Sequence, residues 1–233
     1  MTTLEVCGCK LEQPSGPAGF HFLKNVKLVK VLLNEQIVQM LITECPLLEN
    51  LLLHYCSGLK RFCVSDALKL RVVEFFTSYD EVESANSLDE EFDSIVSKYS
   101  RICLSRCNFL EKVIISSIQL KKLQFVNCSS LKDIDIDTPN LVSFYYEGNS
   151  VPKSSINAPC SWDIRFENEG ALNTRWFLYV KDFLGVNQIE DLFITLKSEK
   201  GDEEPYDIDD LNKLPELPLG DLYLRLDWRC NEA

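Results

Sequence analysis

The fold is decided by residues 48–56, which read LENLLLHYC, with apolar side chains at the first, fourth and sixth positions and a cysteine at the ninth. The same arrangement, with apolar and aromatic substitutions, returns at 120–128 (LKKLQFVNC), at 99–107 (YSRICLSRC) and at 1–9 (MTTLEVCGC). Four cysteines therefore share one phase of the pattern. Ordinary half-buried strands produce alternation but not a phased cysteine, so the pattern indicates an internal repeat.

The repeat continues along the chain when the sixth position is used as a marker. In order of sequence, the markers are Val6, Leu28, Leu53, Phe75, Leu104, Phe125, Tyr146, Phe166, Ile194 and Leu224. They lie 20 to 30 residues apart, close to the interval of about 20 to 29 residues that is typical of leucine-rich repeats. We therefore predict a single leucine-rich-repeat solenoid over residues 1–233, of the α/β class, with a concave parallel β-sheet.

A second apolar ladder lies between the units of the first. Its members are Leu59, Phe62 and Val64, then Leu110, Val113 and Ile115, then Leu131, Ile134 and Ile136. The first ladder mostly carries small hydrogen-bonding side chains at its ninth position, which suit a turn where backbone groups must be satisfied inside a narrow stack. We therefore assign the first ladder to the concave sheet and the second to short return strands.

Helices and acidic insertions are expected in some outer connections. Asn34 is a suitable N-cap for a helix over 35–43, and apolar residues at helical spacing predict another from about Leu172 to Leu184, before Gly185. These helices are expected on the convex side. Two acidic insertions, near 79–99 and 199–210, are expected to be loops, the first leading into a short helix.

Composition limits the partners and the compartment. The net charge of −12 argues against a nucleic-acid or anionic-membrane surface and favours a neutral or basic partner. No apolar run approaches the roughly 18 to 20 residues that span a bilayer, and no N-terminal segment is suited to be a signal peptide. The ten cysteines therefore favour a reducing, intracellular location, in the cytoplasm or the nucleus.

The sequence gives little support for catalysis, a cofactor or a metal. Only His21 and His54 are available for histidine chemistry, and we expect a loop position for the first and a surface position for the second. The pairs Cys7 with Cys9 and Cys103 with Cys107 are explained by the repeat, in which their side chains do not converge as zinc ligands. Phosphate-binding, nucleophile-elbow and zinc-helix motifs are missing from the sequence. We predict a protein that is not an enzyme and needs no cofactor or metal.

The outward face of the concave sheet is the better candidate site. Because side chains alternate along a strand, the fourth and sixth positions should point into the coil and the third, fifth and seventh outward. Exposed aromatic and arginine side chains on a rigid sheet are typical anchors of protein interfaces. The residues that we expect on this face are His54, Glu74, Phe76, Arg101, Lys122, Gln124, Tyr145, Arg165, Phe193, Tyr223 and Arg225.

Several motifs resemble a known family. Residues 41–51 read LITECPLLENL and resemble the LI-x-x-CPLLE-x-L motif of plant F-box leucine-rich-repeat proteins of the FBD-like type. Residues 55–59 resemble the L-x-x-C-x-GL continuation of that motif, and 139–141 resemble its PNL link. The resemblance covers most of the chain and is most specific from residue 22 to residue 146.

The resemblance implies a role in protein recognition. In that family an F-box docks on a Skp-type adaptor of a cullin ubiquitin ligase, while the repeats select the protein substrate. The first residues here already form a repeat strand, so we expect the repeat region only, with the adaptor and cullin as partners only if a longer form has an F-box. The predicted function is a recognition module that resembles the substrate-binding repeats and takes a protein partner.

Two other functions remain open at this point. A small-ligand or hormone sensor would need a deep apolar pocket lined by the outward positions. A truncated remnant without independent function is the other alternative, because the first coil lacks the polar cap that terminal repeats need.

Overall fold

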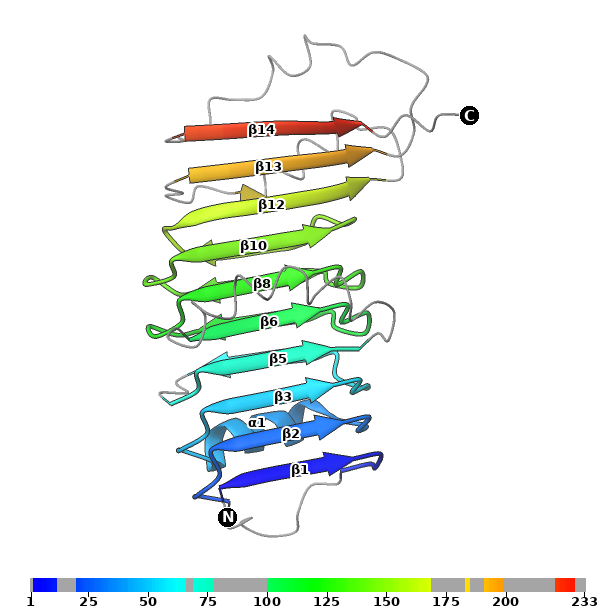
Figure 1. The fold of residues 1–233 in the computed structure, drawn as a ribbon, viewed down its shortest axis with the longest axis vertical. Helices are drawn as coiled ribbons and strands as arrows, with labels where there is room; N and C mark the ends of the chain where they lie inside the picture. The colour runs from blue at the N-terminus through cyan, green and yellow to red at the C-terminus, as the bar shows by residue number, and fades with distance from the viewer. Residues whose placement is uncertain are drawn as a thin grey trace.

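The computed structural model describes residues 2–11, 20–65, 69–77, 100–168, 183–184, 191–198 and 221–228. Within these ranges the chain forms a stack of coils with one long parallel sheet along one side (Figure 1). We call this ten-stranded sheet the main sheet. Its strands, in spatial order, are β1 (Thr3–Cys7), β2 (Asn25–Val29), β3 (Asn50–His54), β5 (Val72–Phe76), β6 (Arg101–Ser105), β8 (Lys122–Val126), β10 (Ser143–Gly148), β12 (Ser161–Asn168), β13 (Asp191–Ser198) and β14 (Asp221–Trp228).

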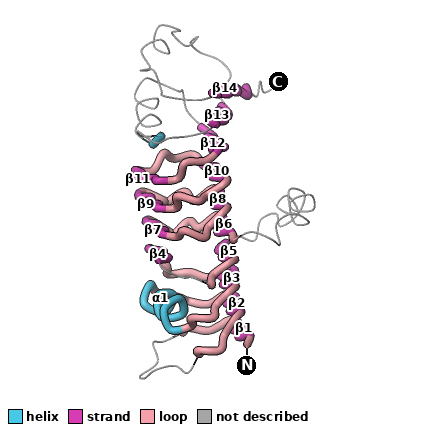
Figure 2. The backbone as a smooth tube through the Cα atoms, turned by 90° about the vertical axis from the view of Figure 1, so that its left-hand side faces the viewer, coloured by secondary structure: helices cyan, strands magenta, loops and turns pink. Residues whose placement is uncertain are grey.

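A second parallel sheet lies on the opposite side of the stack (Figure 2). This back sheet contains, in chain order, β4 (Arg61–Ser65), β7 (Lys112–Ser116), β9 (Asp133–Asp137) and β11 (Lys153–Asn157). The first three strands coincide with the predicted return strands. The fourth was not predicted, because Ser154 stands where the others have an apolar residue; its hydroxyl donates to the carbonyl oxygen of Phe183 at 2.7 Å.

The helix α1 (Glu35–Glu44) ends one residue later than predicted and lies beside β4 (Figure 2). The side chain of Asn34 caps it by accepting a hydrogen bond from the backbone N–H of Ile37 at 2.9 Å. Of the other predicted helix, only the buried Phe183 and Leu184 are described, both helical; the rest of that segment and both acidic insertions lie outside the described residues. The described ranges hold no helix with the length and hydropathy needed to cross a bilayer.

The parallel solenoid that the repeats predict is therefore present, but its content of helix and strand differs from the prediction. The described part of the chain is almost entirely strand and turn, with less helix than the predicted α/β class with a few convex-side helices would have.

The core runs along the inside of the stack. The fourth and sixth positions of the main strands point inward, as Leu51 and Leu53 do with no exposed surface. Toward the C-terminal end the inward residues become aromatic, and the rings of Phe144 and Trp162 lie 4.8 Å apart. Full burial of each such side chain contributes about 1.5 to 3 kcal/mol, so the continuous core supplies most of the stabilisation of the coils.

One predicted register is wrong. Tyr146 lies opposite Ile164, and Ile164 opposite Ile194, so the marker of this coil is Ile164 and not Phe166. β12 carries inward apolar residues two positions apart along its length. Because side chains alternate with a period of two, Ile164 and Phe166 fit the sixth position equally well. The shift is two residues, so Arg165 still points outward, but it lies in the seventh-position row instead of the fifth.

The ninth-position cysteines form a ladder of thiol hydrogen bonds inside the stack. Each buried thiol donates to the sixth-position carbonyl oxygen of the preceding coil. The distances are 3.3, 3.0 and 3.3 Å, from Cys56 to Leu28, from Cys107 to Phe75 and from Cys128 to Leu104. This is the role that the small hydrogen-bonding residues were expected to have.

The residue before the ninth position has a left-handed backbone in several coils. It is Lys30, Tyr55, Arg106 or Asn127, with φ between 51° and 57°, and Gly8 with φ of 67° in the first coil. A non-glycine residue in this conformation costs about 1 to 2 kcal/mol. The turn it creates directs the ninth side chain into the stack, where burial and the thiol hydrogen bond offset the strain.

Candidate functional site

Backbone register places all eleven residues selected from the sequence at the third, fifth or seventh positions of the main strands. They fall into three rows because parallel pairing aligns equivalent positions of successive strands. The third-position row has Arg101 and Lys122, the fifth-position row has Glu74, Gln124, Tyr145, Phe193 and Tyr223, and the seventh-position row has His54, Phe76, Arg165 and Arg225.

Four predicted residues on β3, β5 and β6 form one cluster, which we call the Glu74 cluster: His54, Glu74, Phe76 and Arg101. The guanidinium of Arg101 donates to Glu74 Oε1. Nε2 of His54 lies 3.8 Å from Glu74 Oε2, too far for a direct hydrogen bond. The imidazole ring lies against Phe76 with ring centroids 4.1 Å apart, and the Tyr55 ring meets Phe76 edge-on with centroids 5.2 Å apart.

The carboxylate at the centre of this cluster is held in its charged form. The interaction with His54, followed by the Arg101 charge and hydrogen bond, lowers the pKa of Glu74 although partial burial acts in the opposite direction. The side chains of Glu74 and Arg101 are only 27% and 25% exposed. The cluster is therefore a half-buried ion pair flanked by aromatic rings, and its geometry is fixed before any partner binds.

A second cluster lies on β10 and β12, which we call the Tyr145 cluster: Tyr145, Glu147, Asp163 and Arg165. Arg165 pairs with Asp163 at 3.1 Å, and its guanidinium carbon lies 5.2 Å from the centre of the Tyr145 ring. The Tyr145 hydroxyl donates to Glu147, which also accepts from the side-chain amide of Asn127 at 3.2 Å. Burial and then the Glu147 carboxylate raise the pKa of Tyr145, so the phenol remains a neutral donor at physiological pH.

Five other residues were predicted for this face. Lys122 and Gln124 lie on β8, the strand between the two clusters. Phe193 is 43% exposed on β13. Tyr223 and Arg225 are placed by backbone register on β14, but their side chains lie outside the described residues.

Sequence reasoning missed Glu147 and Asp163. On β10 and β12 it selected only the aromatic and basic residues, Tyr145 and Arg165, and passed over the carboxylates that contact them. The signal was present, because Tyr145 and Glu147, and Asp163 and Arg165, are spaced two apart along a strand and so must share a face.

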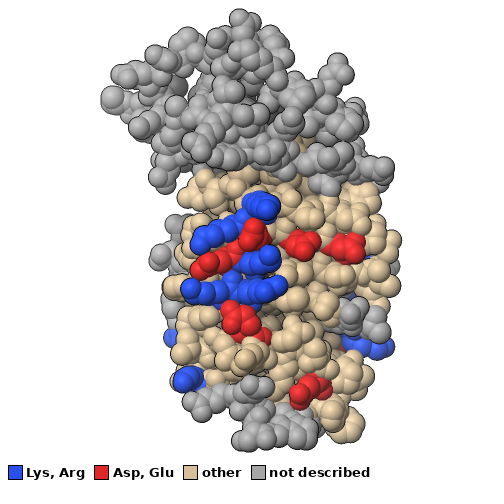
Figure 3. Space-filling view, turned by 180° about the vertical axis from the view of Figure 1, so that it is seen from behind, with Lys and Arg blue, Asp and Glu red and all other residues tan. Residues whose placement is uncertain are grey.

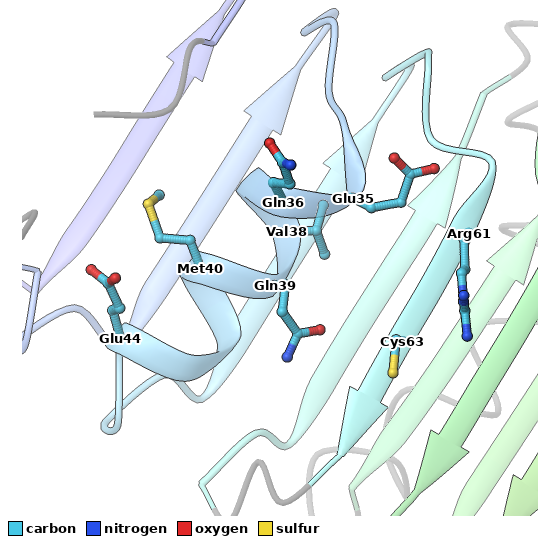
Figure 4. A pocket seen from close by; sticks show the side chains of 8 residues that line it. All are labelled: Glu35, Gln36, Val38, Gln39, Met40, Glu44, Arg61 and Cys63. Carbon is cyan, nitrogen blue, oxygen red and sulfur yellow. The ribbon is translucent and has the colours of Figure 1, made fainter. Parts of the chain in front are cut away.

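A groove of about 530 Å³ lies on the other side of the stack, between α1 and β4 (Figure 4). Its lining combines charged, amide and apolar side chains, namely Glu35, Gln36, Val38, Gln39, Met40, Glu44, Arg61 and Cys63. The sensor alternative needs a deep apolar pocket lined by the outward positions of the main sheet, and this groove is not in that place.

The histidine and cysteine positions are also described. His21 lies in an exposed turn. Cys103 faces outward and is partly exposed, whereas Cys107 is buried. Among the residues that the structure describes, there is no group of three or more His, Cys, Asp or Glu side chains arranged to hold a metal ion.

Comparisons with known proteins connect these repeats to a family. Residues 1–92 match the family model of the LRR repeats of FBD-associated F-box protein At5g56370. The chain is also 39% identical over 59 residues to the F-box/FBD/LRR-repeat protein At1g13570 of Arabidopsis thaliana, which is 25% of this chain and 14% of that protein. No solved structure matches. The resemblance of the repeats to plant FBD-like leucine-rich-repeat proteins is therefore confirmed, and such repeats are typical of protein-interaction modules.

Proposed function

We propose, from this likeness to the repeats of F-box/FBD/LRR proteins, that the chain is a protein-recognition module and that the outward face of its main sheet binds the partner. The observation that carries the proposal is the pair of preformed clusters, Glu74 and Tyr145, on one rigid sheet. Each combines an arginine, one or more carboxylates and an aromatic ring that are already held by one another.

Preformed side chains are suited to binding because little rotamer freedom is left to lose. Ordering a flexible side chain at an interface costs about 0.5 to 1.5 kcal/mol, and this cost is reduced for Arg101, Arg165 and Tyr145. Arginine and tyrosine are also among the residue types that most often dominate interface energies. Truncation of the Tyr145 cluster should therefore reduce affinity more than truncation of an isolated surface residue.

The two clusters are close enough to contact the same partner. Glu74 and Tyr145 lie in one row, separated by three strand-to-strand steps. At about 4.8 Å a step the separation is about 14 Å, which fits within an interface of about 800 Å² on each partner. The Tyr145 cluster has one more carboxylate than cations, which suits a partner with a neutral or basic contact patch.

The names of the similar proteins suggest the wider role. We propose that the repeats select a protein substrate, and that a Skp-type adaptor and cullin join through an F-box in a longer form of the protein. The 14% coverage of the Arabidopsis protein makes this second part a separate proposal from partner binding by the main sheet.

The experiment is a comparative affinity capture from plant extract with three versions of the chain as bait. The first is the wild type, and the second carries Tyr145→Ala and Arg165→Ala. The third is a control with Phe109→Ala and Lys69→Ala, two exposed residues that belong to neither cluster. Proteins kept by the control and lost by the second bait are then purified and tested for direct binding. Recovery of a Skp-type adaptor tests the ligase role.

A partner that binds the wild type and the second bait equally well would contradict the assignment of this face. Far-UV circular dichroism and a thermal melt of each bait confirm that the variants are folded. A cooperative melt of the wild type also counts against the alternative of a truncated remnant.

A further inference from the structure

The back sheet carries a strip of basic side chains along the edge where its strands begin. The first residues of its four strands pair in register as Arg61, Lys112, Asp133 and Lys153. The residue before each of the first three strands adds Lys60, Glu111 and Lys132. We call these five lysine and arginine residues the basic strip.

The strip is unusual in an acidic chain. It contains five of the 24 lysine and arginine residues but only two of the 36 carboxylates, Glu111 and Asp133. Figure 3 shows the basic side chains gathered as a column over the back sheet, with acidic side chains between them and to one side. A local excess of positive charge on a chain of net charge −12 is a specific feature of this face.

Most of the strip is available to a partner. Glu111 lies between Lys60 and Lys132, with Nζ to carboxylate distances of 3.4 and 3.1 Å, yet these lysine side chains remain 72% and 70% exposed. Arg61, Lys112 and Lys153 have no ion pair within the described ranges. The side chains of Arg61 and Lys153 are exposed, and that of Lys112 is partly exposed.

The strip ends at the groove beside α1. Arg61 belongs to both, because it begins β4 and lines the groove (Figure 4). Val38, Met40 and Cys63 give the groove an apolar part, and about 530 Å³ is enough volume for one or two side chains. The basic strip therefore leads into a recess that is partly apolar and that also carries Glu35 and Glu44.

We propose that this composite surface binds an extended acidic segment of a protein partner, with an apolar side chain in the groove and carboxylates along the basic strip. From Arg61 to Lys153 there are three strand steps, or about 14 Å, which four or five residues of extended chain would span. The surface lies on the opposite side of the stack from the Glu74 and Tyr145 clusters, so it goes beyond the proposed function of the main sheet.

A protein segment fits this surface better than a nucleic acid. Glu111 and Asp133 lie within the strip, and Asp135 and Asp137 continue outward from it along β9. A phosphate backbone with a charge on every unit would meet these carboxylates, whereas a peptide can place neutral residues opposite them. The groove also selects for an apolar side chain, which a phosphate chain does not provide.

Fluorescence anisotropy with the full chain tests the proposal. The probe is a fluorescein-labelled heptapeptide of one Leu followed by alternating Glu and Ser, so that neutral residues are available opposite Glu111 and Asp133. It is compared with the same peptide carrying Ser for Leu and with a labelled twelve-residue oligothymidylate. The test variant is Lys112→Glu with Lys153→Glu. The control is Lys69→Glu with Lys121→Glu, which makes the same change in net charge away from the strip.

The expected result is binding of the Leu peptide that weakens about tenfold in the test variant, because each reversal removes an attraction and adds a repulsion. The control variant should remain within about twofold, and the Ser peptide should bind about fivefold more weakly because burial of Leu is lost. Equal loss in both variants, equal affinity of both peptides or tighter binding of the oligothymidylate would each overturn the proposal. Circular dichroism confirms that both variants are folded.

Discussion

The thiol of Cys107 donates a hydrogen bond to the carbonyl oxygen of Phe75, 3.0 Å away and one coil earlier in the stack. Burial raises the pKa of Cys107 well above its ordinary value, so the sulfur keeps the proton that it donates. The same bond recurs from Cys56 and from Cys128. The phased cysteines are therefore structural donors that satisfy backbone carbonyls inside the stack.

Replacement of Cys107 by Ala should lower the free energy of unfolding by about 1 to 3 kcal/mol, because a buried carbonyl loses its donor and a small cavity forms. Urea unfolding followed by circular dichroism measures the change. Cys63→Ala is the matched control, since Cys63 is a partly exposed cysteine on the back sheet, and it should change stability by less than about 0.5 kcal/mol. Equal losses of stability in the two variants would mean that the thiol hydrogen bonds do not stabilise the fold.

The cysteines should differ in reactivity toward iodoacetamide in the native protein. Cys7 is exposed, whereas Cys56 and Cys107 are buried and burial raises the pKa of both thiols. Because the thiolate is the reacting species, we expect native alkylation at Cys7 and protection at the other two until denaturant is added. Peptide mass spectrometry reads the outcome, and rapid native labelling of Cys107 would contradict the ladder.

Leu123 tests the register of the core. It has no exposed surface on β8, so Leu123→Ala should cost about 2 to 5 kcal/mol through the cavity it leaves. Gln124→Ala, the neighbouring outward residue on the same strand, should have little effect on stability. A small effect at Leu123 and a large one at Gln124 would mean that the inward and outward faces are reversed.

Glu74→Gln should destabilise the protein by about 1 kcal/mol at pH 7, after allowance for the partial exposure of the pair. The pKa of Glu74 is lowered by His54 and Arg101 in the folded state. The ionised Glu74 therefore stabilises the folded protein fully above the pKa of about 4.3 that a glutamate has in the unfolded chain. This stabilisation is lost as the pH falls through the lower pKa that Glu74 has in the folded protein. Urea unfolding of both proteins at pH 7, 5 and 3.5 should show a difference that is constant from pH 7 to 5 and smaller at pH 3.5.

Glu5→Gln is the control for this pH series. Glu5 lies in the same row of the main sheet and pairs with Lys27 at 2.9 Å, but its side chain is 59% exposed. Its removal should change stability little at any of the three pH values. A pH-independent difference for Glu74→Gln would indicate a steric cause and not loss of the charge.

Much of the fold was predictable because the repeat fixes which residues point inward. Leu51, Leu53 and Cys56 define one coil, and every coil with the same spacing follows the same rule. The prediction failed where the spacing of apolar residues fitted two registers, or where a polar residue interrupted the apolar pattern. β12 has three inward residues two apart, so Phe166 was chosen over Ile164, and β11 was missed because a serine replaces an apolar residue.

The candidate face was predictable as a set of positions but not as clusters. Alternation placed Glu74, Arg101, Tyr145 and Arg165 outward. The second ladder had already been assigned to the return strands, so the order of the main strands was predictable as well. The pairing also depends on the conformations of side chains that are far apart in the sequence, which spacing does not give. The basic strip escaped notice for the same reason, because Arg61, Lys112 and Lys153 are far apart in the sequence and meet only in the back sheet.

The position of β8 between the two clusters has a consequence for how specificity can change. Glu74 and Tyr145, after which the two clusters are named, lie about 14 Å apart, a distance at which the effects of substitutions usually add. Under the proposed function, each cluster can then be altered while the other keeps its full contribution to the affinity for the partner. Such a chain can acquire a new partner in steps, because one cluster continues to bind while substitutions change the other.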